Sequence, residues 1–534
     1  MKVGEKVYLC EIDCEKKKVM TKGESVQSNN KRIAKNTMLL YVRMLLMMGV
    51  SLYTSRVVLN ALGVEDFGIY NVVGGVVAMF GMLSGSLSSA TSRFLTFELG
   101  KEDMTKLMKV FSTSVTIHIV LSLIVLIFGE VVGVWFLNTH MNIPSNRLIA
   151  ANWVLQCSLL TFIINLISVP YNASIIAHEK MNAFAYISII EAILKLAIVF
   201  LLLVIATDQL IAYAVLLTCV ALLIRIIYSI YCKKHFEECH YRFVYDKKMM
   251  KEISSFAGWN MIGASSAILR GQGTNILINI FSGPAVNAAR GISFQVNNAV
   301  TQFVQSFMTA VNPQITKSYA SKNNEYMMTL IFQGARFSFY LLLLLSMPIL
   351  LDTHYILKLW LKIVPEHTVL FVQLILAFSM LESLSNPLIT AMLATGKIRK
   401  YQLIVGAFQM MNFPVSWILL KLGFFPEITI VIFIFFSLCS LASRLILLRN
   451  MIGLESMLFI KKVLLNVFLV SIVAAIVPIY ISHLLDETFS SLLIILFTCF
   501  LCTLMTIYYV GLKKQEREFV LQKAVLFKNR LFKR

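Results

Sequence analysis

Residues 463–485 read VLLNVFLVSIVAAIVPIYISHLL, a run without one Asp, Glu, Lys or Arg. About 20 apolar residues in a helix are enough to cross the hydrocarbon core of a bilayer. Similar runs recur from Met38 to Gly511, and the 534-residue chain is 58% hydrophobic and only 14% charged. Soluble domains carry about 25% charged residues. The sequence therefore predicts an all-α polytopic membrane protein.

Hydropathy predicts fourteen transmembrane helices, arranged as two six-helix lobes and two further C-terminal helices. Their expected ranges are 37–61, 68–92, 111–137, 147–170, 183–206, 209–231, 253–280, 286–311, 327–351, 367–393, 401–421, 427–449, 463–485 and 490–511. The corresponding parts are an N-terminal extension (1–36), an N-lobe (37–231), an inter-lobe loop (232–252), a C-lobe (253–449), spans 13 and 14 (450–511) and a basic tail (512–534).

A weak internal sequence similarity suggests that the two lobes are repeats. Span 1 ends with Asn60 and Gly63, and span 7 ends with Asn279 and Gly283, about 219 residues later. Repeated halves with a substrate site between them are common in secondary transporters.

The distribution of Lys and Arg predicts the orientation. If the N-terminus is cytoplasmic, 37 of these residues lie on the cytoplasmic side and five lie on the outer side. Cytoplasmic loops are enriched in Lys and Arg, so both termini are expected in the cytoplasm of a bacterial cell, with the protein in the inner membrane. The five outer residues are Arg147, Arg290, Lys358, Lys362 and Lys421. The net charge of +20 is then a feature of membrane topology, and no nucleic-acid partner is expected.

Several classes of protein do not fit this layout. The longest outer loop, 352–366, has room only for a small helix, whereas membrane glycosyltransferases and polymerases usually need a large outer domain. The chain has no G-x-x-x-x-G-K-[ST] phosphate loop. Cys499 and Cys502 lie inside an apolar run and predict neither a disulfide nor a zinc site. We expect no catalytic residue, cofactor or metal, and hence no enzyme.

Polar residues form stripes inside several expected spans. In span 8, residues spaced by 3 and 4 lie on one helix face; they are Gln295, Asn298, Gln302, Gln305, Thr309 and Asn312. Span 4 has a similar stripe of Ser158, Thr161, Asn165, Ser168 and Asn172. Such stripes either join helices to one another or line a water-filled cavity. The length of the span 8 stripe favours a cavity, where amides can bond sugar hydroxyls.

Arginines dominate the deep charges. An arginine at mid-bilayer costs roughly 2.5–3.5 kcal/mol, so Arg43, Arg56 and Arg270 are candidates for a function. The planar guanidinium bonds phosphate oxygens in pairs, which predicts a site for a diphosphate. Arg43 and Arg56 lie near opposite ends of span 1, where snorkelling to the interface is the alternative interpretation.

The acidic residues at depth are fewer. Glu191 and Lys195 are four residues apart in span 5, a spacing that favours an intrahelical ion pair. The pair is either structural or a site of ion coupling. Glu382 in span 10 is a lone acid and a weaker candidate for ion coupling.

The stretch Ser55–Lys101, SRVVLNALGVEDFGIYNVVGGVVAMFGMLSGSLSSATSRFLTFELGK, resembles a known family. Together with the inner turns Ala177–Met181 and Ala391–Lys397, it is similar to the O-antigen flippase-like branch of polysaccharide transporters. This branch belongs to the MATE-like superfamily, which also contains the lipid II flippases. The lipid II flippases use cavity arginines in their early spans and at the start of their second half, and Arg43, Arg56 and Arg270 are placed similarly.

The resemblance implies alternating access between two lobes around a basic cavity. The implied cargo is a polyprenyl-diphosphate-linked oligosaccharide, exported for O-antigen or another surface polysaccharide such as lipopolysaccharide. The implied partners are this lipid, the bilayer, and a polysaccharide polymerase and glycosyltransferases of the same assembly. The alternative is an ion-coupled multidrug exporter of the same fold.

Overall fold

The computed structural model describes residues 32–518 and 521, apart from short gaps between 52 and 79 and residues 140–142, 203, 205, 206 and 362. Helices make up all the regular structure of the described residues. The chain divides into two compact units. The first comprises residues 1–258 and 309–327, and the second comprises residues 259–308 and 328–534.

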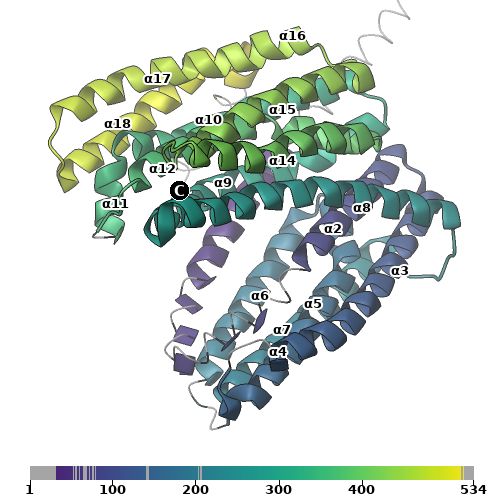
Figure 1. Ribbon diagram of the computed structural model, residues 1–534. Coiled ribbons are helices and arrows are strands. Elements are labelled where there is room, and N and C mark those ends of the chain that lie inside the picture. Colours follow the sequence, from purple (N-terminus) through teal and green to yellow (C-terminus); the bar gives the residue numbers. More distant parts are fainter. Residues whose placement is uncertain are drawn as a thin grey trace, which may run out of the picture. The chain divides into compact units, whose positions relative to one another are not determined.

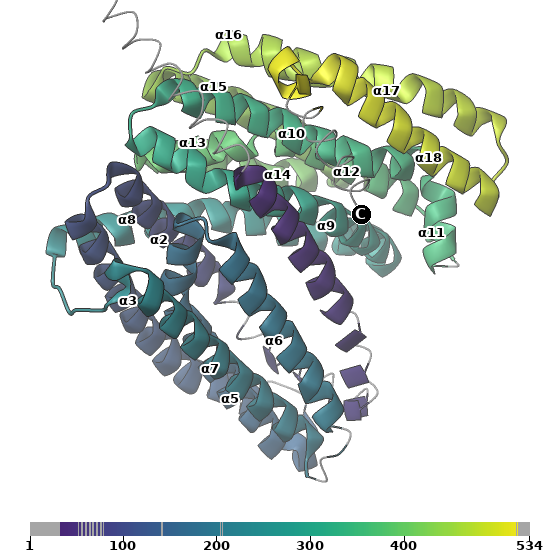
Figure 2. The ribbon, with the colours of Figure 1, turned by 180° about the vertical axis from the view of Figure 1, so that it is seen from behind.

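The first unit is a helix bundle in which α5 and α7 lie side by side (Figures 1 and 2). Its buried core combines aliphatic residues of both helices with residues from α2, α3 and α6. Its elements are the helix Arg32–Ser51, α2 (Gly81–Lys101), α3 (Met104–Phe128), η1 (Gly129–Gly133), α4 (Val134–Thr139), η2 (Ser145–Arg147), α5 (Leu148–Ala177), α6 (Met181–Leu202), α7 (Gln209–His235) and η3 (Glu237–Cys239), followed by the start of α8 (Lys247–Ile268).

The second unit packs α12 against α15 and α14 against α15, and the C-terminal pair α17 and α18 lies side by side (Figures 1 and 2). Its elements after α8 are η4 (Leu269–Gly273), α9 (Thr274–Ala320), α10 (Asn324–Leu351), α11 (Thr353–Leu361), α12 (Thr368–Ser383), α13 (Asn386–Thr395), α14 (Arg399–Lys421), α15 (Ile428–Ile452), α16 (Ser456–Phe459), η5 (Ile460–Leu464), α17 (Leu465–Leu484), α18 (Phe489–Thr506) and η6 (Ile507–Gly511). The last part of α9, from Thr309, belongs to the first unit.

Most of the expected spans coincide with helices that could cross a membrane. Ten helices among the described residues are long and apolar enough, and α12 with α13 pass the same criteria together as a pair bent by 40°. The expected spans 68–92, 253–280 and 286–311 also fall on helices, α2 and α8–η4–α9, where they are described. These three are less apolar because small and polar residues are frequent in them. The all-α polytopic membrane fold is confirmed.

Positive backbone φ angles recur at one separation along the chain, while the internal repeat itself stays a prediction. Gly63 has φ +76° and Gly283 has φ +82°, 220 residues apart. At Gly283 this left-handed conformation breaks α9 into two helices, and glycine adopts it without steric cost. Glu102 (φ 59°) and Lys322 (φ 58°) lie in two further turns at the same separation. Unusual backbone positions thus recur with one period in the two halves.

An ion-pair network joins helix ends at one end of the first unit. Arg147, at the start of α5, donates from Nε to Asp66 Oδ1 at 2.8 Å and from Nη1 to Asp208 Oδ2 at 2.6 Å. Asp208 also accepts hydrogen bonds from the first amides of α7. In the second half, His367 and Glu427 form a comparable pair, with 2.6 Å between Nδ1 and Oε1, about 220 residues later.

At the opposite end of the first unit, Glu179 links the helix Arg32–Ser51 to the end of α9. Its side chain is 1% exposed and lies 2.8 Å from Arg32 Nε and 2.7 Å from Lys317 Nζ. Gly100 packs against the same part of α9, where an added Cβ would lie 2.8 Å from the Cα of Lys317. The end of α9 is therefore bound to the first unit by charge and by close backbone packing.

The segment after α18 is bound to the second unit. Arg336 of α10 is almost fully buried and pairs with Glu516, with 2.5 Å between Nη2 and Oε1. Its Nη1 donates to the carbonyl of Gly511 at 2.9 Å. Glu516, within the expected basic tail, is therefore part of the folded unit.

Candidate functional site

Arg270 lies in η4, a π-helical turn between α8 and α9. Its guanidinium carbon lies 5.2 Å from the ring centre of Phe378 and 5.5 Å from that of Phe433. These rings belong to the buried core around α12 and α15. Among the described residues, Arg270 makes no hydrogen bond, and its side chain is partly exposed. Its charge is supported by aromatic rings, while its N–H donors are uncommitted.

Two further charged residues, Glu382 and Arg444, interact electrostatically with this arginine. Glu382 Oε2 accepts a hydrogen bond from Ser437 at 2.5 Å, and Oε1 lies 3.4 Å from Arg444 Nη2. Arg444 also donates to Ser385 Oγ at 2.7 Å, at the break between α12 and α13. Glu382 interacts electrostatically with both arginines. The cluster of Arg270, Glu382 and Arg444 therefore carries a net charge of +1.

Arg290 supports the π-helical turn from α9. Its Nη2 donates to the carbonyl of Gly271 at 2.9 Å, and its Nη1 donates to Asn275 Oδ1 at 3.1 Å. A π-helical turn leaves backbone groups without their usual helical partners, and such turns are frequent at functional sites. Arg290 therefore holds the turn that presents Arg270.

The positions of Arg290 and Arg444 correct the sequence analysis. Counting loops placed Arg290 on the outer side and Arg444 on the cytoplasmic side, but their exposed fractions are only 5% and 1%. Helical spacing could have revealed Arg290, because Arg290, Ser293 and Asn297 follow intervals of 3 and 4 and are all buried. Asn297 accepts a hydrogen bond from Ser379 at 2.6 Å.

Arg43 occupies a separate position in the first unit. Its guanidinium carbon lies 4.4 Å from the ring centre of Phe184, and it interacts electrostatically with Tyr228 and Glu191. Lys195 Nζ lies 2.6 Å from Glu191 Oε1, so the acid has a lysine as its partner. Arg56 lies outside the described residues.

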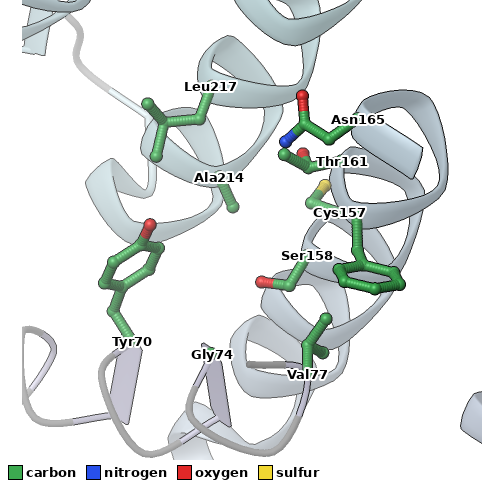
Figure 3. Close-up of a pocket in the computed structure, with 10 residues that line it drawn as sticks. Tyr70, Gly74, Val77, Cys157, Ser158, Thr161, Asn165, Ala214 and Leu217 are labelled. Carbon is green, nitrogen blue, oxygen red and sulfur yellow. The ribbon is translucent and has the colours of Figure 1, made fainter. Parts of the chain in front are cut away.

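A cavity of about 240 Å³ lies within the first unit (Figure 3). Three segments line it. They are the part of the chain that precedes α2, the helix α5 and the helix α7. The lining residues are Tyr70, Gly74, Val77, Cys157, Ser158, Thr161, Phe162, Asn165, Ala214 and Leu217. Three of the five residues of the span 4 stripe, Ser158, Thr161 and the predicted Asn165, thus line this cavity.

The span 8 stripe divides into exposed and partly buried residues. Gln295, Asn298, Gln302 and Gln305 are all exposed on α9. An amide that faces lipid would lack hydrogen-bond partners, which is costly in hydrocarbon. This face of α9 therefore suits a hydrated surface better than a lipid-facing one.

Comparison with known proteins decides the family. A family model described as "Polysaccharide biosynthesis protein" matches residues 33–319. The chain belongs to this family. No curated protein sequence matches the chain significantly. Its fold is that of a multi-pass membrane protein, with solved MATE transporter structures as similar folds.

Solved structures of MATE transporters share the fold of this polysaccharide biosynthesis protein. An outward-facing multidrug resistance MATE transporter of the MOP superfamily is 13% identical, with a TM-score of 0.68 over 80% of this chain and 96% of that chain. A Vibrio cholerae MATE transporter in the bent form is 14% identical, with a TM-score of 0.66 over 82% and 99%. A MOP superfamily transporter from Pyrococcus furiosus, whose title reports reverse polarity of its binding pocket, is 14% identical, with a TM-score of 0.65 over 80% and 96%.

Proposed function

We propose that the protein is a flippase that moves a polyprenyl-diphosphate-linked oligosaccharide from the inner to the outer face of the bacterial inner membrane. Arg270 is the observation that carries this proposal. It is a deep arginine that rests on two aromatic rings and has no hydrogen bond among the described residues. An unused charge at this depth would be costly, whereas a diphosphate would occupy its donors in pairs.

The neighbouring charges favour an anionic cargo. Glu382 is flanked by Arg444 and Arg270, and the sum of the three charges is positive. A cationic drug would meet repulsion here. Arg43 is a second candidate for the headgroup, in the first unit, and Arg56 is a third that the sequence predicts.

The remaining polar residues suit the oligosaccharide. We assign Gln295, Asn298, Gln302 and Gln305 to the lining of a hydrated passage, because amides donate to and accept from sugar hydroxyls without requiring charge. Alternating access between two six-helix lobes would carry the sugars past them. Both termini would then lie in the cytoplasm, where the cargo is assembled, and O-antigen or another lipopolysaccharide component is the class of product.

An ion-coupled multidrug exporter is the alternative, since structures with this fold include a multidrug resistance transporter. Purified protein in liposomes distinguishes the two functions. We expect it to move a fluorescent polyprenyl-diphosphate oligosaccharide between leaflets and not to move a cationic dye. Dye transport that requires Glu382, without movement of the lipid, would replace the flippase with the drug exporter.

A further inference from the structure

We propose that the cavity of the first unit is a subsite for one uncharged sugar ring of the cargo. This assignment rests on the proposed flippase function and adds a specificity to it. The cavity is formed entirely by residues of the first unit, from the segment around Tyr70, from α5 and from α7 (Figure 3).

The size of the cavity favours a single small ring. Pockets for drug-sized ligands usually have volumes of roughly 300–1,000 Å³, and this cavity has about 240 Å³. Water occupies about 30 Å³ per molecule in the liquid, so several waters would be displaced by a ring that fills the space. A whole oligosaccharide or a large aromatic drug would not fit.

The lining offers hydrogen-bond partners without charge. None of the ten lining residues is ionised at neutral pH. Tyr70, Ser158 and Asn165 present two hydroxyls and an amide toward the hollow (Figure 3), and their side chains have no hydrogen-bond partner among the described residues. Thr161 is fixed by its hydroxyl contact of 2.9 Å with Thr218. Hydroxyls and amides both donate and accept, as the hydroxyls of a sugar require.

The apolar part of the lining suits the other side of a sugar ring. Phe162 and the ring of Tyr70 provide aromatic surface, and the carbon–hydrogen face of a pyranose is apolar. Tyr70 is supported edge-on by Tyr213, with 5.0 Å between ring centres, and Phe162 packs against Phe80 at 6.0 Å. A wall fixed in this way reduces the entropy lost on binding.

None of the described lining residues is a cation, and this gives the subsite its selectivity. A uronic acid would place a carboxylate among residues that cannot neutralise it, and burying an unpaired charge is costly. An amino sugar with a free ammonium group would meet the same penalty. Neutral hexoses and N-acetylated sugars would be accepted.

Filling the cavity at Gly74 tests the proposal. A Cβ at Gly74 meets no atom within 4 Å, so Gly74→Ala and Gly74→Leu add graded bulk without a backbone clash. Gly81 is equally open but does not line the cavity, which makes Gly81→Leu the matched control. Each variant is reconstituted with polyprenyl diphosphates that carry a neutral hexose, a uronic acid or no sugar.

We expect the wild type to flip the neutral glycolipid at least tenfold faster than the acidic one. Gly74→Leu should lower the rate for the neutral glycolipid to that of the sugar-free lipid, Gly74→Ala should lie between, and Gly81→Leu should keep the wild-type preference. Equal wild-type rates for the neutral and acidic glycolipids, or an equal loss for all three lipids in Gly74→Leu, would overturn the subsite.

A second measurement separates this proposal from the flippase function. In Ser158→Cys, alkylation of the new thiol by a small maleimide should slow severalfold in the presence of a methyl hexoside and not in the presence of the corresponding uronic acid. If the wild type moves none of the lipids, the flippase function fails. The slower alkylation of the thiol in the presence of the hexoside then tests the subsite by itself. Identical alkylation rates with and without the hexoside would refute the subsite even in an active flippase.

Discussion

Replacing Arg270 with alanine should abolish flipping and leave the fold almost unchanged. The proposed contact with a diphosphate consists of two charge-assisted hydrogen bonds, each worth about 1.5–3 kcal/mol. Losing both at the lower value removes about 3 kcal/mol, which corresponds to at least about a hundredfold loss in rate. Arg270→Lys keeps the charge but not the planar fork, so it should retain an intermediate rate.

The cost of the same substitution to stability is much smaller. Arg270 loses two contacts with aromatic rings, and such contacts contribute roughly 0.5–1 kcal/mol each at exposed sites. Its removal also gives up its attraction to Glu382 and relieves its weaker repulsion from Arg444. We therefore expect a loss of at most about 1–2 kcal/mol in the free energy of unfolding, and a nearly normal amount of protein in the membrane.

Two other arginines provide the controls. Arg444 is buried and holds Glu382 and Ser385, so Arg444→Ala should cost about 3–5 kcal/mol, as when a buried ion pair loses one partner. Arg449 lies exposed in the last turn of the same helix, and Arg449→Ala should change neither property. Leaflet transfer of the fluorescent lipid and thermal unfolding in detergent measure the two effects separately.

The reasoning about Arg270 would be refuted in either of two ways. Arg270→Ala could lose as much stability as Arg444→Ala, which would make Arg270 a structural residue. Alternatively, the alanine variant could flip the lipid at the wild-type rate, and the headgroup site would then have to be sought at Arg43.

Three further predictions concern the structural contacts. Glu516→Gln should lower the free energy of unfolding by about 3 kcal/mol, because it leaves buried Arg336 unpaired; a thermal unfolding midpoint equal to that of the wild type would contradict this contact. Gly100→Ala should lower the free energy of unfolding by about 1–3 kcal/mol, because the added Cβ clashes with the backbone of Lys317. The variant should then be less resistant to proteolysis, and unchanged resistance would disprove this prediction. Burial alone would raise the pKa of Asp208, but hydrogen bonds from the guanidinium of Arg147 and from the first amides of α7 hold it below the ordinary value. The stability that Asp208 contributes is therefore present above an unfolded pKa of roughly 3.9 and is lost as the pH falls through the lower folded pKa. In Asp208→Asn, the free energy of unfolding should depend less on pH in this acidic range. The same pH dependence as in the wild type would exclude the contact.

Hydropathy and periodicity were sufficient to predict the membrane fold. Apolar runs of the length of the bilayer core have few alternatives. The loop 352–366 was considered scarcely long enough for a small helix, and it contains the 9-residue helix α11. The breaks within helices were not predicted. The bend between α12 and α13 and the π-helical turn η4 depend on packing against neighbouring helices, which periodicity along one helix does not describe.

The charged cluster shows where sequence reasoning reached its limit. Arg270 and Glu382 were selected individually, but their common partner Arg444 was counted as a loop residue. Arg444 lies inside the expected span 427–449 and well inside α15, which continues to Ile452, so the error lay in assigning it to the cytoplasmic side when the Lys and Arg residues were counted. The signal was its position seven residues after Ser437, which puts both side chains on one face of the helix.

Glu382 is the residue on which the choice between a cationic and an anionic cargo turns. Both of its carboxylate oxygens have partners, Ser437 on one side and Arg444 on the other. A cation that bound this carboxylate would have to displace Arg444, which is almost fully buried and could not readily reach water. The displaced charge would remain beside Arg270, in surroundings where unpaired charges are costly. An anion meets the opposite situation, because the cluster already has one positive charge more than it can neutralise. This imbalance favours a cargo that brings its own negative charge, as a lipid diphosphate does.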